Sequence, residues 1–351
     1  MKKTFKKVKE KYSKKPKTEQ DFNQQTPNIT NKTVSEHREE VLSSARKYIY
    51  PLQHSKHKIV LITTSLFIVT ILAFFTFTMV SLYKQKSYSS FLYGVSRVIP
   101  FPVAKAGPNF VAYENYLFEL KHYIHYYQNQ QKLDFKVESG QQQLAEFKKR
   151  ALEKVVNDAY IKQLAKEKGV SVSNQEVEAE IQVVRNQNRL GGSDKVFEDV
   201  LKEYWGWSVD DFKRSLRQQL LAQKLLPVLD PTVQQRADQA KQELDSGAKF
   251  EAVAKKYSDD AASKDNGGEY GYAIDNSNRD ISANTTAALF KLEKGEVSDV
   301  VNAGYSLEIV KNIQPEGDKV KAAHITFNYK DINSYLNDRK DKNKTTLYIH
   351  L

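Results

Sequence analysis

The apolar positions of this chain are densest in residues 59–83, which read IVLITTSLFIVTILAFFTFTMVSLY and contain no charged side chain. About 20 apolar residues in a helix are enough to cross the hydrocarbon core of a bilayer. A cleavable signal peptide has a shorter apolar region and lacks a polar leader of this length. The run therefore predicts one retained transmembrane helix.

Helical periodicity begins at about residue 109, because apolar side chains there recur every three or four positions. The clearest stripe consists of Leu144, Phe147, Ala151, Val155 and Ala159. Gly169 is typical of the position just after a helix, and Ser173 and Ser208 are typical of helix starts. These signals predict a bundle of four or five helices, with Trp205 and Trp207 packed between them.

Strict alternation of apolar and polar positions appears in the sequence KVKAAHITFNY, residues 319–329. Such alternation predicts a core strand, here 320–327, with His324 pointing to one face of a sheet. A second strand pattern, YSLEIVKNI, precedes it by a connector of about six residues.

Charge gives the expected orientation of the membrane helix. Residues 1–58 contain 15 Lys and Arg against 6 Asp and Glu, so they carry most of the net charge of +11. Because basic flanks favour the cytoplasmic side, we expect the tail inside and residues 84–351 outside the cytoplasmic membrane. The tail itself is expected to be a solvated segment with anionic lipid as its candidate partner, and no nucleic-acid partner is expected.

Composition removes several classes of function. The mean hydropathy of −0.62 is too low for a protein with many membrane spans. The chain has no cysteine, which excludes disulfides, thiolate nucleophiles and cysteine-based metal sites. The histidines show no metal-ligand spacing, so we predict neither a metal nor a cofactor.

Two stretches resemble known families. Residues 104–229 resemble the N-terminal domain of SurA-like chaperones, most clearly in AKEKGVSVSNQEV and GWSVDDFKRSLRQQL. The order of YSDD, NGGEYGY, AALFKL and KGEVSDVV within residues 248–313 resembles a parvulin-type peptidyl-prolyl isomerase. The resemblance implies an α+β chain with a helical chaperone domain and an FKBP-like antiparallel sheet with helices.

The first strand of a parvulin domain is missing from its usual place, because no strand pattern lies between Leu226 and Thr232. The strand at 320–327 has the sequence expected of it. Since the first and last parvulin strands are antiparallel neighbours, a circular permutation explains the new position. The alternative is a truncated second parvulin repeat that begins at Lys319.

The resemblance also assigns site residues. Asp260 and His324 take the catalytic positions, and the substrate-binding positions are Tyr270, Ile281, Tyr305 and Glu308. Two departures are visible: Glu308 replaces a second histidine, and Thr285 or Thr286 stands where a pocket Phe is common. Structural alternatives are that Asp260 caps a turn and that His324 is a hydrogen-bonded core residue.

The sequence as a whole predicts a membrane-anchored extracytoplasmic foldase of the SurA, PrsA and PpiD type. Its expected partners are unfolded or proline-containing polypeptides and the membrane, and it is expected to isomerise prolyl bonds. The alternative is a non-catalytic chaperone or binding module with a parvulin fold. The expected parts are a basic cytoplasmic tail (1–58), the transmembrane helix (59–83), a linker (84–103), the SurA-like domain (104–229) and the parvulin-like domain (230–351).

Overall fold

The computed structural model describes residues 30–49, 52–188, 190 and 193–351. It divides into two units, Met1–Phe77 and Thr78–Leu351, and each is considered by itself. The predicted basic tail lies outside the described residues as far as residue 29. The described part of the first unit is helical, with α2 at Asn31–Ile49 followed by α3 at Leu52–Met79.

The predicted apolar helix is present. Within the described residues, one helical stretch, His57–Lys84, is long and apolar enough to cross a membrane. It comprises most of α3 and a π-helical turn, η2, at Val80–Lys84. Large side chains such as Ile62 and Phe67 are exposed along it. Because so much exposed apolar surface is unfavourable in water, this helix suits the core of a bilayer.

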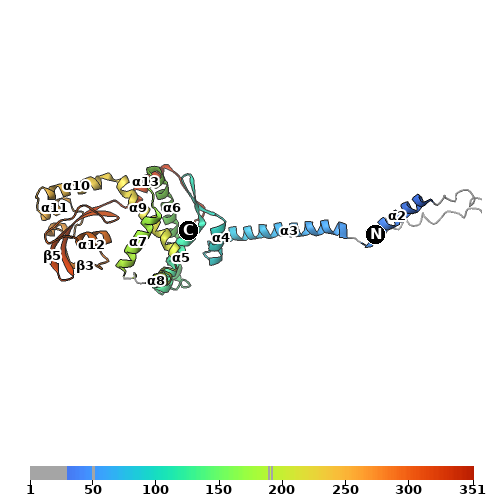
Figure 1. The fold of residues 1–351 in the computed structure, drawn as a ribbon, viewed down its shortest axis with the longest axis horizontal. Coiled ribbons are helices and arrows are strands. Elements are labelled where there is room, and N and C mark those ends of the chain that lie inside the picture. Colours follow the sequence, from blue (N-terminus) through green and yellow to red (C-terminus); the bar gives the residue numbers. More distant parts are fainter. Residues whose placement is uncertain (1–29, 50–51, 189, 191–192) are drawn as a thin grey trace, which may run out of the picture. The chain divides into compact units, whose positions relative to one another are not determined.

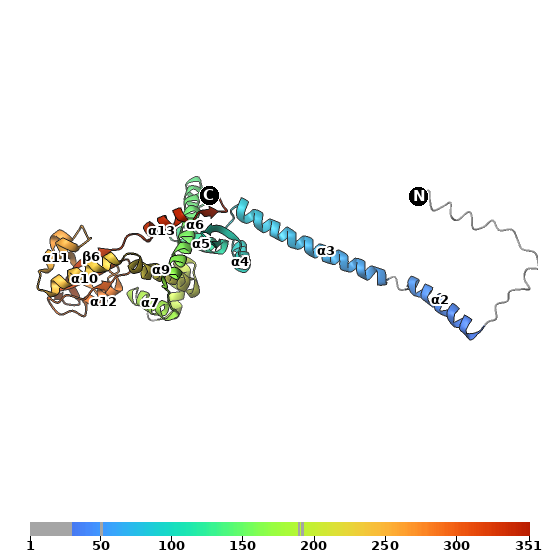
Figure 2. The ribbon, with the colours of Figure 1, turned by 90° about the horizontal axis from the view of Figure 1, so that it is seen from above.

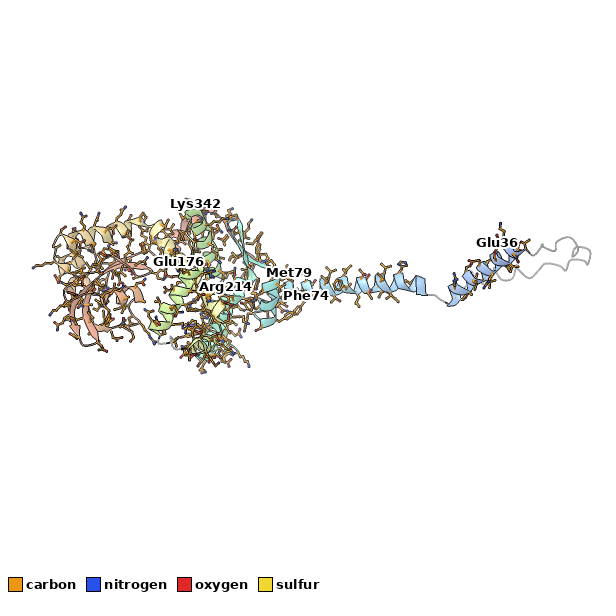
Figure 3. The ribbon with its side chains drawn as sticks, viewed as in Figure 1. Glu36, Phe74, Met79, Glu176, Arg214 and Lys342 are labelled. Carbon is orange, nitrogen blue, oxygen red and sulfur yellow. The ribbon has the colours of Figure 1, made fainter. Side chains whose placement is uncertain are left out.

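The second unit opens with the predicted helical bundle. Its helices are α5 (Tyr113–Asn129), α6 (Glu138–Lys168), α7 (Asn174–Gln187), α8 (Asp194–Trp205) and α9 (Val209–Leu229). The end signals act as expected: Gly169 stops α6 with a left-handed φ of 68°, and Ser173 forms a capping box with Glu176. Arg214 of α9, labelled in Figure 3, ties the bundle together by binding both carboxylate oxygens of Glu114 on α5.

The segment expected as a linker, residues 84–103, is folded, so that expectation is wrong. It contains α4 (Ser90–Val98) and the start of β1 (Pro102–Ala106), which pairs with β2 (Asn109–Ala112). Leu92 and Val103 are buried in the core of the helical bundle. The strands are short, and the third strand of their sheet comes from the far end of the chain, so local sequence contains little trace of them.

The sheet domain alternates helices and antiparallel strands. Its elements are α10 (Pro231–Asp245), α11 (Phe250–Tyr257), the 3₁₀ turn η3 (Lys264–Asn266), β3 (Glu269–Asp275), α12 (Ala283–Leu289), β4 (Val301–Asn302), β5 (Ser306–Glu316) and β6 (Lys319–Asn328). The strand order is β3-β6-β5-β4. The predicted α+β fold is therefore present, and β6, the strand expected at 320–327, lies between β3 and β5.

The two faces of this sheet bury different side chains. One face, with Ile309, Ile325 and Phe327, packs against α10 and α11. Figures 1 and 2 both draw these helices alongside the strands of the sheet. The opposite face places Val310, Val320 and Ala322 against Ile281 and Leu289. Side chains alternate between faces along a strand, so His324 shares this second face with Val310, its partner in the ladder.

The last residues return to the helical bundle, which corrects the expected boundary of the parvulin-like domain at 351. The helix α13 (Ile332–Lys342) leads to β7 (Thr345–Leu347), which pairs with β1. Asn157 of α6 donates a hydrogen bond to Asn333 over 2.7 Å, and the Tyr160 hydroxyl donates to the carbonyl of Asn343. In Figures 1 and 2 the red C-terminal segment accordingly runs back beside α6.

Candidate functional site

An aspartate and a histidine meet on the second face of the sheet. Asp260 lies in the turn after α11, and His324 lies in the centre of β6. His324 Nε2 is 3.1 Å from Asp260 Oδ2. A carboxylate oxygen only accepts hydrogen bonds, so this ring nitrogen carries a hydrogen and donates it. The structure therefore brings together the two residues that the sequence placed at the catalytic positions.

The histidine is held by its backbone and by its other ring nitrogen. Its backbone N–H donates to the carbonyl of Gly268, 2.8 Å away. A Cβ on Gly268 would lie 2.3 Å from the carbonyl oxygen of His324, so only glycine permits this approach. On the side chain, Nδ1 is 3.1 Å from the hydroxyl of Thr326. The ring thus has a partner at each nitrogen and one orientation.

Asp260 is organised by its own turn as well as by the histidine. Its Oδ2 accepts a short hydrogen bond from the hydroxyl of Ser263, and its Oδ1 accepts one from the backbone of Ala262. The Ser263 bond is the main cause that lowers the pKa of the Asp260 carboxyl, with smaller contributions from Ala262 and His324, against the opposing effect of burial. The carboxylate is therefore charged at neutral pH. Asp260 both caps a turn and binds the histidine, so the two interpretations are compatible.

Tyr270 covers the histidine. Its ring stacks on that of His324 with centroids 4.1 Å apart, and it comes from β3, the strand next to β6. Its buried hydroxyl has no hydrogen-bond partner among the described residues. Burial, with the Glu308 carboxyl as a smaller cause, raises the pKa of this phenol. Ile281 lies in the same apolar cluster as Tyr270, so two of the predicted binding residues form one wall.

Glu308 faces the same side of the sheet as His324, because it pairs with Thr326 in the ladder. The two side chains form no direct hydrogen bond, since the ring nitrogens of His324 bind Asp260, Ser263 and Thr326. Burial raises the pKa of the Glu308 carboxyl, although Thr285 and His324 oppose that shift. Its Oε2 atom is buried without a partner in the described part of the chain.

Replacement of Glu308 by glutamine is expected to stabilise the protein at neutral pH. A carboxyl whose pKa rises on folding favours the folded state below its ordinary value of 4.5, and this contribution is lost as the pH rises towards the folded pKa. Glutamine is neutral at every pH, so the stability difference should be near zero at about pH 4 and grow towards pH 8. Urea unfolding across this range measures it, and a constant difference would contradict an unfavourable buried carboxylate.

Tyr305 does not join this group, which corrects its predicted role in binding. It precedes β5, is 50% exposed, and lines a cavity together with Lys154 and Asn333 of the helical bundle and α13. Its backbone carbonyl accepts a hydrogen bond from Tyr329. Its place at the end of the strand turns the side chain towards the helices rather than towards His324.

Two site residues escaped sequence reasoning, Ser263 and Thr326. Ser263 follows Asp260 by three positions, a spacing that lets a turn bring its hydroxyl onto the carboxylate. Thr326 follows His324 by two, so both point to one face of the strand. Each spacing is a usable signal, but neither is specific, because serines and threonines at such distances from an aspartate or histidine are common.

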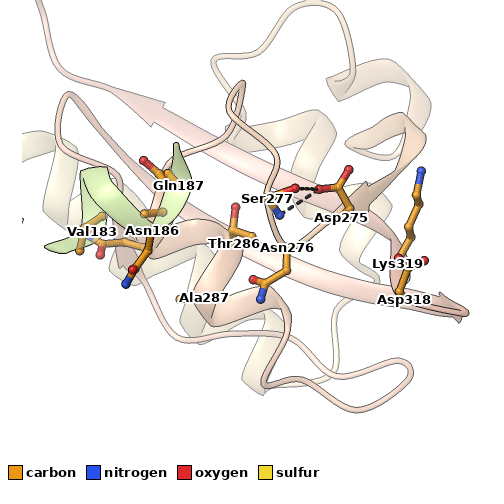
Figure 4. A pocket seen from close by; sticks show the side chains of 12 residues that line it. Val183, Asn186, Gln187, Asp275, Asn276, Ser277, Thr286, Ala287, Asp318 and Lys319 are labelled. Carbon is orange, nitrogen blue, oxygen red and sulfur yellow. Dashed lines mark hydrogen bonds between the residues drawn. The ribbon is translucent and has the colours of Figure 1, made fainter. Parts of the chain in front are cut away.

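A cavity lies beside α12, away from His324. It has a volume of about 720 Å³ and is enclosed by α7, the residues after β3 and α12. Figure 4 shows Asn186 and Gln187 of α7 facing Thr286 of α12 across this space. Thr286 lines the cavity, whereas the neighbouring Thr285 acts on Glu308. Both threonines are buried, so α12 contributes hydroxyl groups rather than an aromatic ring to this region.

Comparison with known families places two models on the chain. A model of the SurA-like N-terminal domain matches residues 52–226, and a model of the PPIC-type PPIase domain matches residues 229–314. The second match ends before β6, so His324 reaches the site from outside the matched residues. The order of the two domains agrees with the resemblance seen in the sequence.

Several curated proteins are similar to this chain. The foldase protein PrsA of Clostridium kluyveri is 30% identical over 128 residues, 36% of this chain and 36% of that protein. PrsA of Caldanaerobacter subterraneus subsp. tengcongensis is 28% identical over 222 residues, 56% of this chain and 65% of its own length. PrsA of Bacillus subtilis is 34% identical over 124 residues, 35% of this chain and 37% of that protein. These matches span between about a third and two thirds of the relatives.

A solved structure of peptidylprolyl isomerase (PrsA) from Bacillus anthracis also aligns with the chain. It is 23% identical, covers 54% of this chain and 88% of its own, and has a TM-score of 0.19.

Proposed function

We propose that this chain, in which a SurA-like N-terminal domain precedes a PPIC-type PPIase domain, is a membrane-anchored foldase. It isomerises prolyl bonds in unfolded polypeptides and holds such polypeptides in its helical bundle. The observation that carries this proposal is the Asp260–His324 pair on the face of the sheet, in contact with Ser263 and Tyr270.

Isomerisation of a prolyl bond requires few functional groups in the site. Rotation about a prolyl bond has a barrier of about 18–20 kcal/mol and breaks no covalent bond. Catalysis therefore needs groups that bind the twisted amide better than the planar one. As the amide twists, its nitrogen loses resonance and becomes a better hydrogen-bond acceptor. The Ser263 hydroxyl and His324 Nε2–H are donors held beside Asp260, and the Ser263 hydroxyl can rotate towards that nitrogen.

Tyr270 and Ile281 provide the apolar side of the site. The proline ring has no polar groups, so it gains by contact with the Tyr270 ring and the side chain of Ile281. Asp260, which is 30% exposed against 13% for His324, lies at the open side. A prolyl peptide would then enter past Asp260 and place its amide beside Ser263 and His324 Nε2.

An isomerase assay tests this proposal directly. The purified chain is expected to accelerate cis–trans exchange in short Xaa–Pro peptides, measured by a coupled protease or by NMR exchange. A rate equal to that of the uncatalysed peptide, with the sheet domain shown to be folded, would remove the enzymatic part of the proposal.

The specific features of the site also support a second candidate, a non-catalytic binding module. Glu308 and Thr285 are polar side chains in the region where the proline ring would lie. The stacked Tyr270 ring also covers His324. In this case the domain would bind prolyl peptides without accelerating their isomerisation, and the same assay separates the two candidates.

The proposed orientation places the basic tail in the cytoplasm and the second unit outside. It rests on the charge of residues 1–58 and on the apolar helix His57–Lys84. Protease added to intact cells that lack an outer barrier is expected to degrade residues 84–351 and leave an N-terminal fragment. Permeabilised cells serve as the control, because there the tail should also be digested. Protection of the second unit in intact cells would reverse the orientation.

A further inference from the structure

The apolar helical stretch His57–Lys84 ends inside the folded second unit. Its first apolar residue is Ile59, and about 20 helical residues cross the hydrocarbon core, so with the proposed anchor that core ends near Thr78. The second unit also begins at Thr78, and the side chains of Thr78 and Leu82 are 0% exposed. The last turn of the stretch, Val80–Lys84, therefore lies at the level of the outer lipid headgroups.

The chain turns back directly after this last turn. The backbone N–H of Ser87 donates a hydrogen bond to the carbonyl of Ser81, six residues earlier, over 3.0 Å. Lys86 precedes Ser87 and has a left-handed φ of 51°. A left-handed residue followed by such a bond is the Schellman motif, which redirects the chain at the end of a helix. The connector to α4 is therefore held beside the helix end instead of extending away from it.

Both ends of α4 are tied to that last turn. At its start, Ser90 follows Ser87 by three residues, which span at most about 10 Å. At its end, the carbonyl of Pro102, four residues after Val98, accepts a hydrogen bond from the hydroxyl of Tyr83 over 2.6 Å. A helix of 9 residues is about 14 Å long, so with both ends near one turn α4 lies across the helix end. It therefore lies along the membrane surface.

The outward side of α4 is apolar. Phe91, Val95 and Val98 are separated by four and three positions, so they share one side of the helix; we call them the α4 stripe. Phe91 is 56% exposed and Val98 is 82% exposed, whereas Leu92 and Ser96 are buried in the second unit. A row of exposed apolar side chains is unfavourable in water but stable at the boundary between lipid headgroups and acyl chains.

The charge around the α4 stripe favours a phospholipid surface. Residues 78–113 contain no acidic side chain and four basic ones, which are Lys84, Lys86, Arg97 and Lys105. Lys84 ends the apolar stretch, and Arg97 is adjacent to Val98 in the stripe. Apolar side chains flanked by lysine and arginine are typical of a helix that lies in a lipid interface, where the cations meet phosphate groups.

We propose that the α4 stripe is inserted into the outer leaflet of the membrane, at the boundary between headgroups and acyl chains. The inference rests on the proposed membrane anchor and adds a second, interfacial contact to it. One membrane helix gives a single point of attachment, about which the attached unit can tilt. A second contact through α4 restricts this tilt and holds the second unit in one orientation over the bilayer.

The chain has no cysteine, so a single introduced cysteine can be labelled selectively. The full chain with Val98→Cys, labelled with the fluorophore NBD, would be placed in nanodiscs of phosphatidylcholine and phosphatidylglycerol. A phosphatidylcholine with a nitroxide near the top of its acyl chain should quench this label at least about threefold more strongly than the same label at a control position. Aqueous iodide should show the opposite preference.

Val228→Cys is the matched control, because Val228 is also an exposed valine, at 45%. It lies about 25 Å along α9 from Asp211, which lines one cavity together with Tyr93 of α4. The label at Val228 should therefore be open to iodide and distant from the lipid nitroxide. Equal lipid quenching at Val98 and Val228 would overturn a contact specific to α4.

A third label separates this inference from the anchor on which it rests. Val69→Cys lies in α3 and is 59% exposed, so a nitroxide deep in the acyl chain should quench it if α3 crosses the bilayer. Lipid quenching at Val69 but not at Val98, with Val98 open to iodide, overturns the α4 contact and leaves the anchor. No lipid quenching at Val69 overturns both. A Val98 label shielded from lipid nitroxide and from iodide would identify a protein partner and also overturn the proposal.

Discussion

A chain that ends at Glu316 will lack a cooperatively folded sheet domain. The truncation removes β6 from between β3 and β5, and with it Ile325 and Phe327, neither of which has measurable exposure. Loss of each such side chain costs about 2–5 kcal/mol, and the total stability of a domain is about 5–15 kcal/mol. Calorimetry of the purified protein should therefore show that the transition of the sheet domain has disappeared.

The matched control ends the chain at Lys330. It also lacks α13 and β7, but it keeps β6 and therefore the whole β3-β6-β5-β4 sheet. Its sheet domain should still melt cooperatively, while the helical bundle loses the strand that pairs with β1. If the two truncations gave the same sheet-domain transition, β6 would not be an integral strand, and a peripheral second repeat would be the better interpretation of residues 319–329.

Replacement of His324 by alanine will lower kcat/KM for prolyl isomerisation by about 10- to 150-fold. The variant loses the ring that donates to Asp260 and stacks under Tyr270. A hydrogen bond that involves a charged group contributes about 1.5–3 kcal/mol, and each 1.36 kcal/mol changes a rate tenfold. Asp260→Ala should have a similar effect, because Ser263 and His324 then lose the acceptor that orients them.

Two comparisons make this prediction specific. Tyr305→Phe should leave the rate unchanged, since Tyr305 lies towards the helical bundle and away from His324. The double variant that lacks both Asp260 and His324 should be little slower than either single variant, because the two side chains act as one unit. Additive losses would show that they act separately, and an unchanged rate in His324→Ala would support the non-catalytic binding module.

Several residues of the candidate site could be predicted from the sequence, because two family patterns include them. The motif around Asp260 and the alternating strand around His324 singled out these two residues, and in the structure His324 Nε2 lies 3.1 Å from Asp260 Oδ2. Tyr270 and Ile281, which the resemblance assigned to substrate binding, lie in one apolar cluster. Ser263, Thr326 and the true position of Tyr305 were not predicted, because each depends on which way one side chain turns in the folded protein.

Features that are encoded within one segment could be predicted from the sequence alone. The apolar helix at His57–Lys84 needs only an unbroken apolar run, and the ends of α6, α7 and α9 need only a glycine or a capping serine. Helix signals of this kind are local, since their hydrogen bonds join residues a few positions apart. The strand β6 could also be predicted, because alternation of apolar and polar positions is the local pattern of a strand.

Contacts between distant segments could be identified only in the folded structure. The β1–β7 pairing joins residues from opposite ends of the second unit, and it converts the expected linker into part of the core. The stacking of Trp207 on Phe118 and His122 of α5 likewise needs α5 and the turn at Gly206 to approach one another. Such contacts leave weak local patterns because short strands and single rings gain their stability from partners far along the chain, and those partners are defined only once the chain has folded.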